Sequence, residues 1–358
     1  MYDIGIIGAG PAGATLARLL ADRYRVLLLD SGRQKCCGGI LTQRSQMMFA
    51  KLDIALPRQV LIDPQPFAVS IMDWDNHLLQ SYARQYVNID RTAFDRWLLS
   101  LIPPTVDVRN HAVYQKSEAG SEGLTLHFKE RDEPKTARVR RLVGADGAFS
   151  TVRREFFSSA PMPKRYVAVQ HWFEREAVSA TPQFRVDIWN DYMGIFDSKL
   201  TDFYIWTIPK GTQLILGGAF PLGTNVSTAM HAVREQLKSR GLHLGTPFKR
   251  EAGQILRPIW QSSLCFGDSR VFLVGEASGL ISPSSAEGIS GALISASHLA
   301  EAFRHSDAET PGFVISFYRR LLRKRLWSLW LKKAKIPLMF NPLLRNCIMR
   351  SGITALRR

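Results

Sequence analysis

Three glycines near the start of the chain have the spacing of a dinucleotide-binding turn. Gly8, Gly10 and Gly13 follow the apolar run 4–7 and open a helical stretch. In such a turn the first glycine permits the sharp bend, the second lets a pyrophosphate approach the backbone, and the third lets the helix pack on the strand. Asp30 ends the next apolar run, about 20 residues on, where a carboxylate accepts hydrogen bonds from a ribose 2′-OH. This arrangement favours FAD or NAD over NADP.

Two later stretches also place acidic residues and glycines at the ends of apolar runs. Asp146 ends such a run within residues 141–154, and Glu276 ends another within residues 271–293. Each run is followed by turn residues and a helical stretch, as expected where strands deliver a loop to a nucleotide. The candidate cofactor-binding residues of the three stretches are Gly8, Gly10, Ala12, Gly13, Asp30, Ser31, Asp146, Gly147, Gly275, Glu276, Gly279, Pro283, Gly288 and Ile289.

These three stretches resemble those of the flavoprotein monooxygenase-like superfamily, which has the fold of para-hydroxybenzoate hydroxylase. The resemblance covers roughly residues 1–305, and three ordered motifs are far more specific than one. It implies that the first stretch binds the ADP half of FAD and that the middle stretch lies near the pyrophosphate. It also implies that the third contacts the ribityl chain and that the next helix faces the isoalloxazine. Glu276 stands where the superfamily usually has aspartate.

Arg91 belongs to the same resemblance. Arg91, Phe94, Asp95 and Leu98 match the R-x-x-F-D-x-x-L motif of the superfamily, which implies that Arg91 lies beside the flavin. The alternative is a surface arginine at a helix start. The helix dipole disfavours a cation there unless it is paired, so the residue type itself favours an anionic or flavin partner.

Two further strings resemble the geranylgeranyl reductase family of FAD-dependent oxidoreductases. KCCGGILT (35–42) is similar to its P-C-G-G segment, and FYIWTIPKG (203–211) is similar to its Y-x-W-x-F-P-K-G strand. IMRSG (348–352) is similar to an enterobacterial branch of that family. The resemblance implies reduction of C=C bonds in a hydrophobic or isoprenoid substrate, with electrons from an external donor, NAD(P)H or a reductase or ferredoxin. It also implies that Cys37, Gly38 and Gly39 bind the cofactor.

The candidate catalytic residues are Cys37, Tyr204 and Trp206. Cys37 could protonate a carbon or shape the face of the flavin, or it could be a small packing residue. Tyr204 could donate a proton or a hydrogen bond, although an ordinary pKa of about 10 makes it a slow acid. His171 could be an acid or a structural residue. Aromatic residues on strands could line an apolar channel or form an ordinary core; they are Trp172, Trp189, Phe196, Tyr204 and Trp206.

Two other functions compete with a reductase. The string at 204–209 approaches the W-x-W-x-I-P string of flavin halogenases, but residues 67–81 lack the lysine that those enzymes carry. Hydroxylation by a monooxygenase stays open because the fold serves both chemistries. A non-catalytic flavin-bound membrane protein is the third alternative.

Composition is that of an ordinary globular protein. The 358 residues are 46% apolar and 22% charged. The four cysteines form no disulfide framework and no zinc spacing, so we expect no metal and a reducing, cytoplasmic setting. No apolar run reaches the length of a transmembrane helix.

The order of apolar patterns predicts an α/β fold, with a Rossmann-like FAD-binding domain interrupted by an antiparallel sheet. We assign residues 1–60, 87–160 and 265–305 to the FAD-binding domain, and 61–86 and 161–264 to the substrate-binding sheet. The patterns predict helices at 90–102, 228–240 and 288–305, two or three strands within 106–143, and strands that include 184–189.

The remaining segment, 306–358, is predicted to be helical and is strongly basic. The net charge is +16, and no Asp or Glu occurs from Thr310 to Arg358. Trp327 and Trp330 are interleaved with lysines and arginines there. Such a helix suits an anionic membrane surface on the inner face. The alternatives are a solvated helix packed on the body or an acidic carrier partner, and no nucleic-acid motif accompanies the charge.

Overall fold

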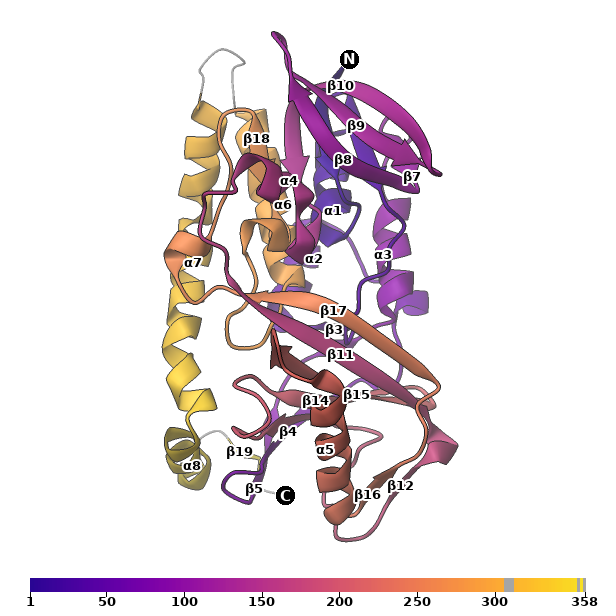
Figure 1. Cartoon of the computed structure of the whole chain (residues 1–358), viewed down its shortest axis with the longest axis vertical. Helices are drawn as coiled ribbons and strands as arrows, with labels where there is room; N and C mark the ends of the chain where they lie inside the picture. The colour runs from indigo at the N-terminus through magenta and orange to yellow at the C-terminus, as the bar shows by residue number, and fades with distance from the viewer. Residues whose placement is uncertain (306–311, 353–354, 357–358) are drawn as a thin grey trace.

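The two sheets of this protein lie at opposite ends of an elongated molecule (Figure 1). The structure, a computed structural model, describes residues 1–305, 312–352 and 355–356. Helices cover one side of the first sheet, and a long helix near the C-terminus runs past both sheets (Figure 1). The predicted α/β class is confirmed.

The first sheet is built on parallel strands whose apolar runs are buried. Its order is β7–β2–β1–β10–β9–β8, and β18 also pairs with β10. β7, β2, β1, β10 and β18 are mutually parallel, whereas β9 and β8 extend the sheet antiparallel. The region 106–143 thus holds four strands, one more than the most we predicted. The strands of this sheet are β1 (Tyr2–Ile7), β2 (Val26–Asp30), β7 (Asp107–Asn110), β8 (Ala112–Ala119), β9 (Leu124–Glu130), β10 (Glu133–Gly144) and β18 (Val271–Leu273).

Helices pack against one face of this sheet and bury its larger core. The core joins Ile4 and Leu28 from the strands to Leu16 and Leu293 from the helices. The predicted helices at 90–102 and 288–305 are confirmed, and Asp90 caps the first of them by accepting from Ala93 N at 2.9 Å. The helices of this part are α1 (Pro11–Leu20), α2 (Gln43–Lys51), α3 (Arg91–Ser100), α4 (Thr151–Phe156) and α6 (Ile289–Arg304).

The second sheet is mostly antiparallel and has two apolar faces. Its order is β17–β11–β15–β14–β13–β4–β5–β19, with β13 and β4 parallel. Helix α5 (Val226–Ser239), predicted at 228–240, covers one face with Met230 and Val233. The strands are β4 (Ala68–Asp73), β5 (Leu78–Ala83), β11 (Lys164–Glu174), β13 (Tyr192–Phe196), β14 (Ile205–Lys210), β15 (Gln213–Pro221), β17 (Lys249–Arg257) and β19 (Ala355–Leu356). Two small ladders join β3 (Ile40–Leu41) to β6 (Val87–Asn88), and β12 (Val178–Ala180) to β16 (Leu242–Leu244).

The predicted strand at 184–189 is wrong, because this segment forms turns. Phe184, Val186 and Ile188 are buried in the core beneath α5, which explains their alternation. The backbone nevertheless turns at Asp187, whose side chain accepts from Trp189 N at 3.1 Å. An irregular segment that lies on a core can therefore show the apolar period of a strand.

The basic C-terminal segment packs along the body. Its helices are α7 (Phe313–Phe340) and α8 (Pro342–Ser351), while residues 306–311, 353–354 and 357–358 of the predicted segment lie outside the described residues. Helix α7 packs on α6 and buries Tyr318, Leu322 and Leu329. Within residues 1–305 and 312–352, no helix has the length and apolar content needed to cross a membrane.

A buried ion pair fastens α8 to the second sheet. Arg345 donates to both carboxylate oxygens of Asp73 at 2.8 Å and to Asp75 at 2.6 Å. The Asp73 side chain is fully buried. Burial alone would raise the pKa of Asp73, but hydrogen bonds from Arg345 and Asn76 hold it below the ordinary 3.8.

We expect Arg345→Met to lower the free energy of unfolding by about 3–5 kcal/mol, because it leaves Asp73 charged, buried and unpaired. The folded-state pKa of Asp73 is depressed, so the stabilisation is present above the ordinary pKa and is lost as the pH falls through the folded value. Urea unfolding at pH 7 and at decreasing pH measures this difference. Arg350→Met, on the exposed side of α8, is the control, and equal stabilities of the two variants would contradict the prediction.

Candidate functional site

The three predicted cofactor stretches meet at one edge of the first sheet. They follow the carboxyl ends of β1, β10 and β18, which are adjacent parallel strands. Ala145 N donates to the Ile7 carbonyl at 2.8 Å, and Val274 N donates to that of Gly144 at 3.0 Å. In open α/β sheets this edge is where nucleotides bind.

The glycines of the first stretch fit a bound pyrophosphate. A Cβ at Gly13 would lie 1.8 Å from the Gly8 carbonyl oxygen, so only glycine lets α1 pack this closely on β1. Gly8 itself has φ +98°, which favours glycine. A Cβ at Gly10 would meet no described atom within 4 Å, and Gly10 is the N-cap of α1. The open space therefore lies beside free backbone N–H groups at a helix N-terminus, as a phosphate requires.

Two carboxylates flank this turn. Asp30 ends β2 next to Ser31, and its Oδ1 accepts from Gly32 N at 3.0 Å. Asp146 Oδ2 accepts from Thr151 N at 2.7 Å and from Val152 N at 3.2 Å. Burial raises the pKa of Asp146, and its Oδ1 is buried without a hydrogen-bond partner among the described residues. A buried carboxylate oxygen without a partner in the described part of the chain, next to the glycine turn, fits a site for a polar group.

The third stretch is held by its own side chains. Gly275 has φ +60° and packs against Ala12 of α1, at the start of a short 3-10 turn, Gly275–Ser278. Glu276 is buried; its Oε1 accepts from Leu256 N at 3.0 Å and its Oε2 forms an ion pair with Lys35. The longer carboxylate thus ties this turn to β17 and to the loop that carries the two adjacent cysteines. Gly279 follows with φ +87°, while Gly288 caps α6 and Ile289 begins it.

Cys37 and Arg91 lie together on the loop and helix beside this edge. Arg91 is only 12% exposed, and its Nε donates to both oxygens of Asp95 at 3.0 Å, so it is not a surface residue. Burial opposes ionisation of the Cys37 thiol, but the charge of Arg91 and the hydrogen bond from Gly39 N bring its pKa below the ordinary value. Burial, with Glu251, instead raises the pKa of Cys36 to about 12. Of the two thiols, that of Cys37 is therefore the more reactive, because its pKa is the lower.

Lys210 is a buried lysine that holds the loop of Cys37 in place. It was not predicted from the sequence as a site residue. Lys210 Nζ donates to the carbonyls of Gly39 at 3.1 Å and Ile89 at 2.8 Å, and to Asn88 Oδ1 at 2.5 Å. Gly39 lies two residues after Cys37, and Ile89 lies two residues before Arg91. Burial lowers the pKa of Lys210 to about 7. Through these hydrogen bonds the Lys210 side chain joins the two segments that carry the candidate flavin-side groups.

An aromatic wall faces the same loop from the second sheet. Trp206 and Ile208 of β14 belong to one buried cluster with Phe203, Tyr204 and Phe340, and we call these five residues the aromatic wall. A Cβ at Gly38 would lie 2.5 Å from Ile208 Cδ1, so glycine is required where the loop meets the wall. Burial raises the pKa of Tyr204, whose hydroxyl donates to the Ser285 carbonyl at 2.9 Å.

Arg257 holds the loop between β18 and α6 against this wall. Its Nε donates to the Pro283 carbonyl at 2.9 Å, and its guanidinium lies 4.5 Å from the Phe340 ring centroid. No sequence motif marks this arginine, because its role depends on contacts between distant segments. Pro283 is thereby fixed by a side chain of the second sheet.

Two residues that we considered from the sequence lie elsewhere. His171 faces α5, where Arg250 and Arg234 lie near it, and burial with these charges lowers its pKa. Trp189 packs on the α5 side of the sheet under Arg175. Neither residue lines the aromatic wall, whereas Phe196 contacts Tyr204 at a centroid distance of 6.0 Å.

Gly147, with φ +74°, lies at the edge of the first sheet.

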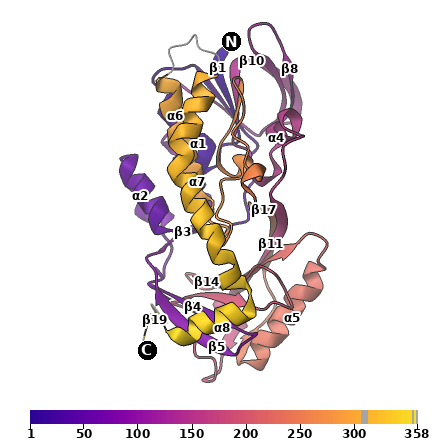
Figure 2. The same cartoon turned by 90° about the vertical axis from the view of Figure 1, so that its left-hand side faces the viewer.

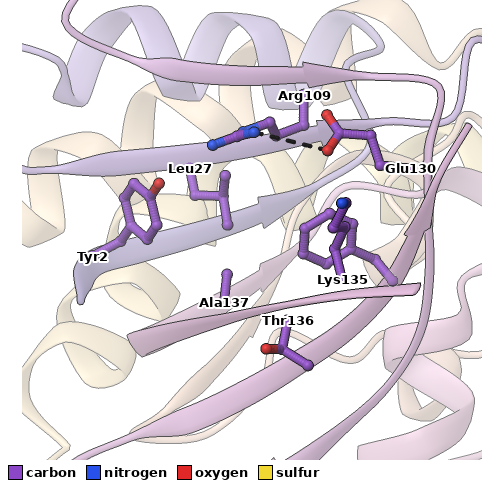
Figure 3. Close-up of a pocket in the computed structure, with 8 residues that line it drawn as sticks. Tyr2, Leu27, Arg109, Glu130, Lys135, Thr136 and Ala137 are labelled. Atoms are coloured by element: carbon purple, nitrogen blue, oxygen red, sulfur yellow. Dashed lines mark ion pairs between the residues drawn. The ribbon is translucent and has the colours of Figure 1, made fainter. Parts of the chain in front are cut away.

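A recess of about 390 Å³ lies away from this edge (Figure 3). Its lining includes Tyr2 and Leu27, near the amino ends of their strands, and Arg109, which pairs with Glu130 at 3.7 Å. Ligands of parallel sheets bind at the carboxyl ends, so this recess is not the nucleotide site. No group of three potential metal ligands occurs among the described residues.

The glycine turn, the Asp146 carboxylate beside it and the adjoining antiparallel sheet define a flavoprotein of the FAD-binding type, and the cofactor is FAD. The chain belongs to the FAD binding domain family, which matches residues 1–182. It is 37% identical to Protein CbrA of Escherichia coli O6:H1 over 98% of this chain and 94% of that protein.

Solved structures share the fold. A geranylgeranyl bacteriochlorophyll reductase-like protein from Thermoplasma acidophilum has a TM-score of 0.76 at 18% identity, covering 94% of this chain and 87% of that one. PqsL from Pseudomonas aeruginosa, a probable FAD-dependent monooxygenase, has a TM-score of 0.69 at 17% identity, covering 98% and 99%. The chain therefore shares its fold with a reductase-like protein and with a probable FAD-dependent monooxygenase.

Proposed function

We propose that this protein reduces carbon–carbon double bonds in an isoprenoid or other lipidic substrate, with electrons from an external donor. The observation that carries the proposal is the aromatic wall, which faces the Cys37–Gly39 loop at the carboxyl edge of the nucleotide-binding sheet. An apolar wall beside a redox cofactor suits a ligand without polar groups at its reacting carbons. The strings at 35–42 and 203–211, which resemble geranylgeranyl reductases, also support it.

In such a reduction, different residues of the chain would donate the proton and bind the substrate. When bound and reduced, FAD supplies the hydride equivalent that a double bond requires. Cys37 is the candidate proton donor, because Arg91 holds its pKa below the ordinary value and so makes the thiol a stronger acid. Tyr204 is the weaker acid, because burial raises its pKa. We assign Tyr204 and Trp206 to binding, where their rings exclude water from the substrate.

Anaerobic turnover tests this proposal. Dithionite-reduced protein mixed with a geranylgeranyl lipid in detergent should yield products heavier by two hydrogen atoms per reduced bond, measured by mass spectrometry. We expect Cys37→Ala to retain FAD absorbance and to reduce the lipid roughly a hundredfold more slowly, as loss of a general acid predicts. Cys36→Ala is the matched control and should keep the wild-type rate. An oxygen-dependent product heavier by one oxygen atom would favour a monooxygenase, and the absence of any product would overturn the proposal.

A further inference from the structure

The two C-terminal helices expose several large apolar side chains. Trp327 is 62% exposed and Trp330 54%, and their rings stack at 5.1 Å. Leu343, at the start of α8, is 76% exposed. Figure 2 shows α7 and α8 together on the side of the molecule that faces the viewer. We call this surface the α7–α8 face; its exposed apolar residues are Trp327, Trp330, Leu331, Leu338, Leu343, Leu344 and Ile348.

Helical spacing separates this face from the packed side of α7. Leu322 and Leu329 are buried and lie two turns apart on the inner side. Trp327, Leu331 and Leu338 recur at intervals of four and seven residues on the opposite side. The exposed apolar residues therefore form a second stripe on α7, and these side chains do not pack into the core of the protein.

The charges on this face have one sign. No Asp or Glu occurs between residues 310 and 358. The exposed basic residues around the stripe are Arg320, Arg323, Lys324, Lys335 and Arg350. Two copies meeting through this face would bring the same cations together. A nucleic acid would neutralise the cations but would leave exposed leucines on a helix without a partner.

We propose that the α7–α8 face docks the protein on an anionic lipid surface. The tryptophans and leucines enter the boundary between headgroups and acyl chains, while the lysines and arginines contact anionic headgroups. The aromatic wall adjoins this surface, because Phe340 at the end of α7 stacks on Phe203 at 5.5 Å. Arg345 fixes α8 to the second sheet, so the face and the wall are held together. Docking does not rest on the proposed reduction, but it would bring a lipid substrate close to the wall.

Vesicle flotation of the full-length FAD-loaded protein tests the docking. We expect the protein to float with phosphatidylglycerol–phosphatidylcholine vesicles at low salt, to be released by high salt, and to stay unbound with phosphatidylcholine alone. Trp327→Ser/Trp330→Ser/Leu331→Ser should lower the vesicle-bound fraction about tenfold or more, because the apolar anchor is lost. Flavin absorbance and the melting temperature of this variant should match the wild type.

Leu222→Ser/Phe248→Ser is the matched control, because these side chains are similarly exposed on another part of the surface. It should float like the wild type. Equal flotation of the triple variant, or equal binding to neutral vesicles, would overturn the proposal. So would a wild-type dimer that the triple variant converts to a monomer, since the partner would then be a second copy. Lipid reduction is assayed in detergent, so failure of one proposal leaves the other separately measurable.

Discussion

Replacement of Gly10 by valine is expected to weaken FAD binding strongly while leaving the fold of the apoprotein intact. Gly10 has φ −66° and ψ −175°, which any residue adopts, and a Cβ there would meet no described atom within 4 Å. The added side chain would instead occupy the space in which a pyrophosphate approaches the first turn of α1. We expect a loss of affinity of roughly a hundredfold or more, equivalent to about 2.7 kcal/mol.

Titration of apoprotein with FAD, followed by flavin fluorescence, measures this loss, and thermal unfolding checks the fold. Gly120→Val, in the hairpin between β8 and β9, is the control and should bind FAD normally. Gly13→Ala provides a contrast, because its Cβ would lie 1.8 Å from a backbone oxygen and should disturb the packing of α1 itself. Wild-type affinity in Gly10→Val would show that the cofactor does not approach this turn.

The parts of the site that could be predicted from the sequence are those fixed by local rules. Gly8, Gly10 and Gly13 have separate steric roles within a single turn, so their spacing, together with the flanking apolar runs and Asp30, identifies the strand, turn and helix. Asp90 likewise marks the start of α3, because a cap acts over three residues. Parallel neighbours then place the three loops at one edge of the sheet, since the carboxyl ends of such strands coincide.

The parts that could not be predicted depend on contacts between distant segments. Lys210 lies in a recognisable string, but nothing in that string shows that its ammonium reaches Gly39 and Ile89. Glu276 stays a predicted cofactor contact, but nothing in the sequence indicates that its oxygens also bind Lys35 and the backbone of Leu256. The basic composition of the C-terminal segment predicted a helix, but only the packing of α7 shows which side is free.

The same contacts explain why two adjacent thiols should differ in reactivity. Both cysteines are half-buried on one loop, and burial disfavours both thiolates. Cys37 faces the guanidinium of Arg91, which overcomes that cost, whereas Cys36 lies near the carboxylate of Glu251, which adds to it. Lys210 holds the Cys37 loop and the start of α3 together, so it keeps Arg91 where this difference arises.

We therefore expect iodoacetamide at pH 8 to label Cys37 in the apoprotein far ahead of Cys36. Burial and Glu251 raise the pKa of Cys36 to about 12, whereas Arg91 brings the pKa of Cys37 below its ordinary value, so Cys37 has the larger thiolate fraction at pH 8. Because the folded pKa of Cys37 is depressed, its labelling should rise at a lower pH than in the unfolded chain. Arg91→Met should shift this rise to higher pH and Arg91→Lys should largely restore it, as followed by peptide mass spectrometry with exposed Cys347 as internal reference. Equal labelling of the two neighbours, or an unchanged profile in Arg91→Met, would show that Arg91 does not govern the thiol, and the assignment of Cys37 as proton donor would lose its physical basis.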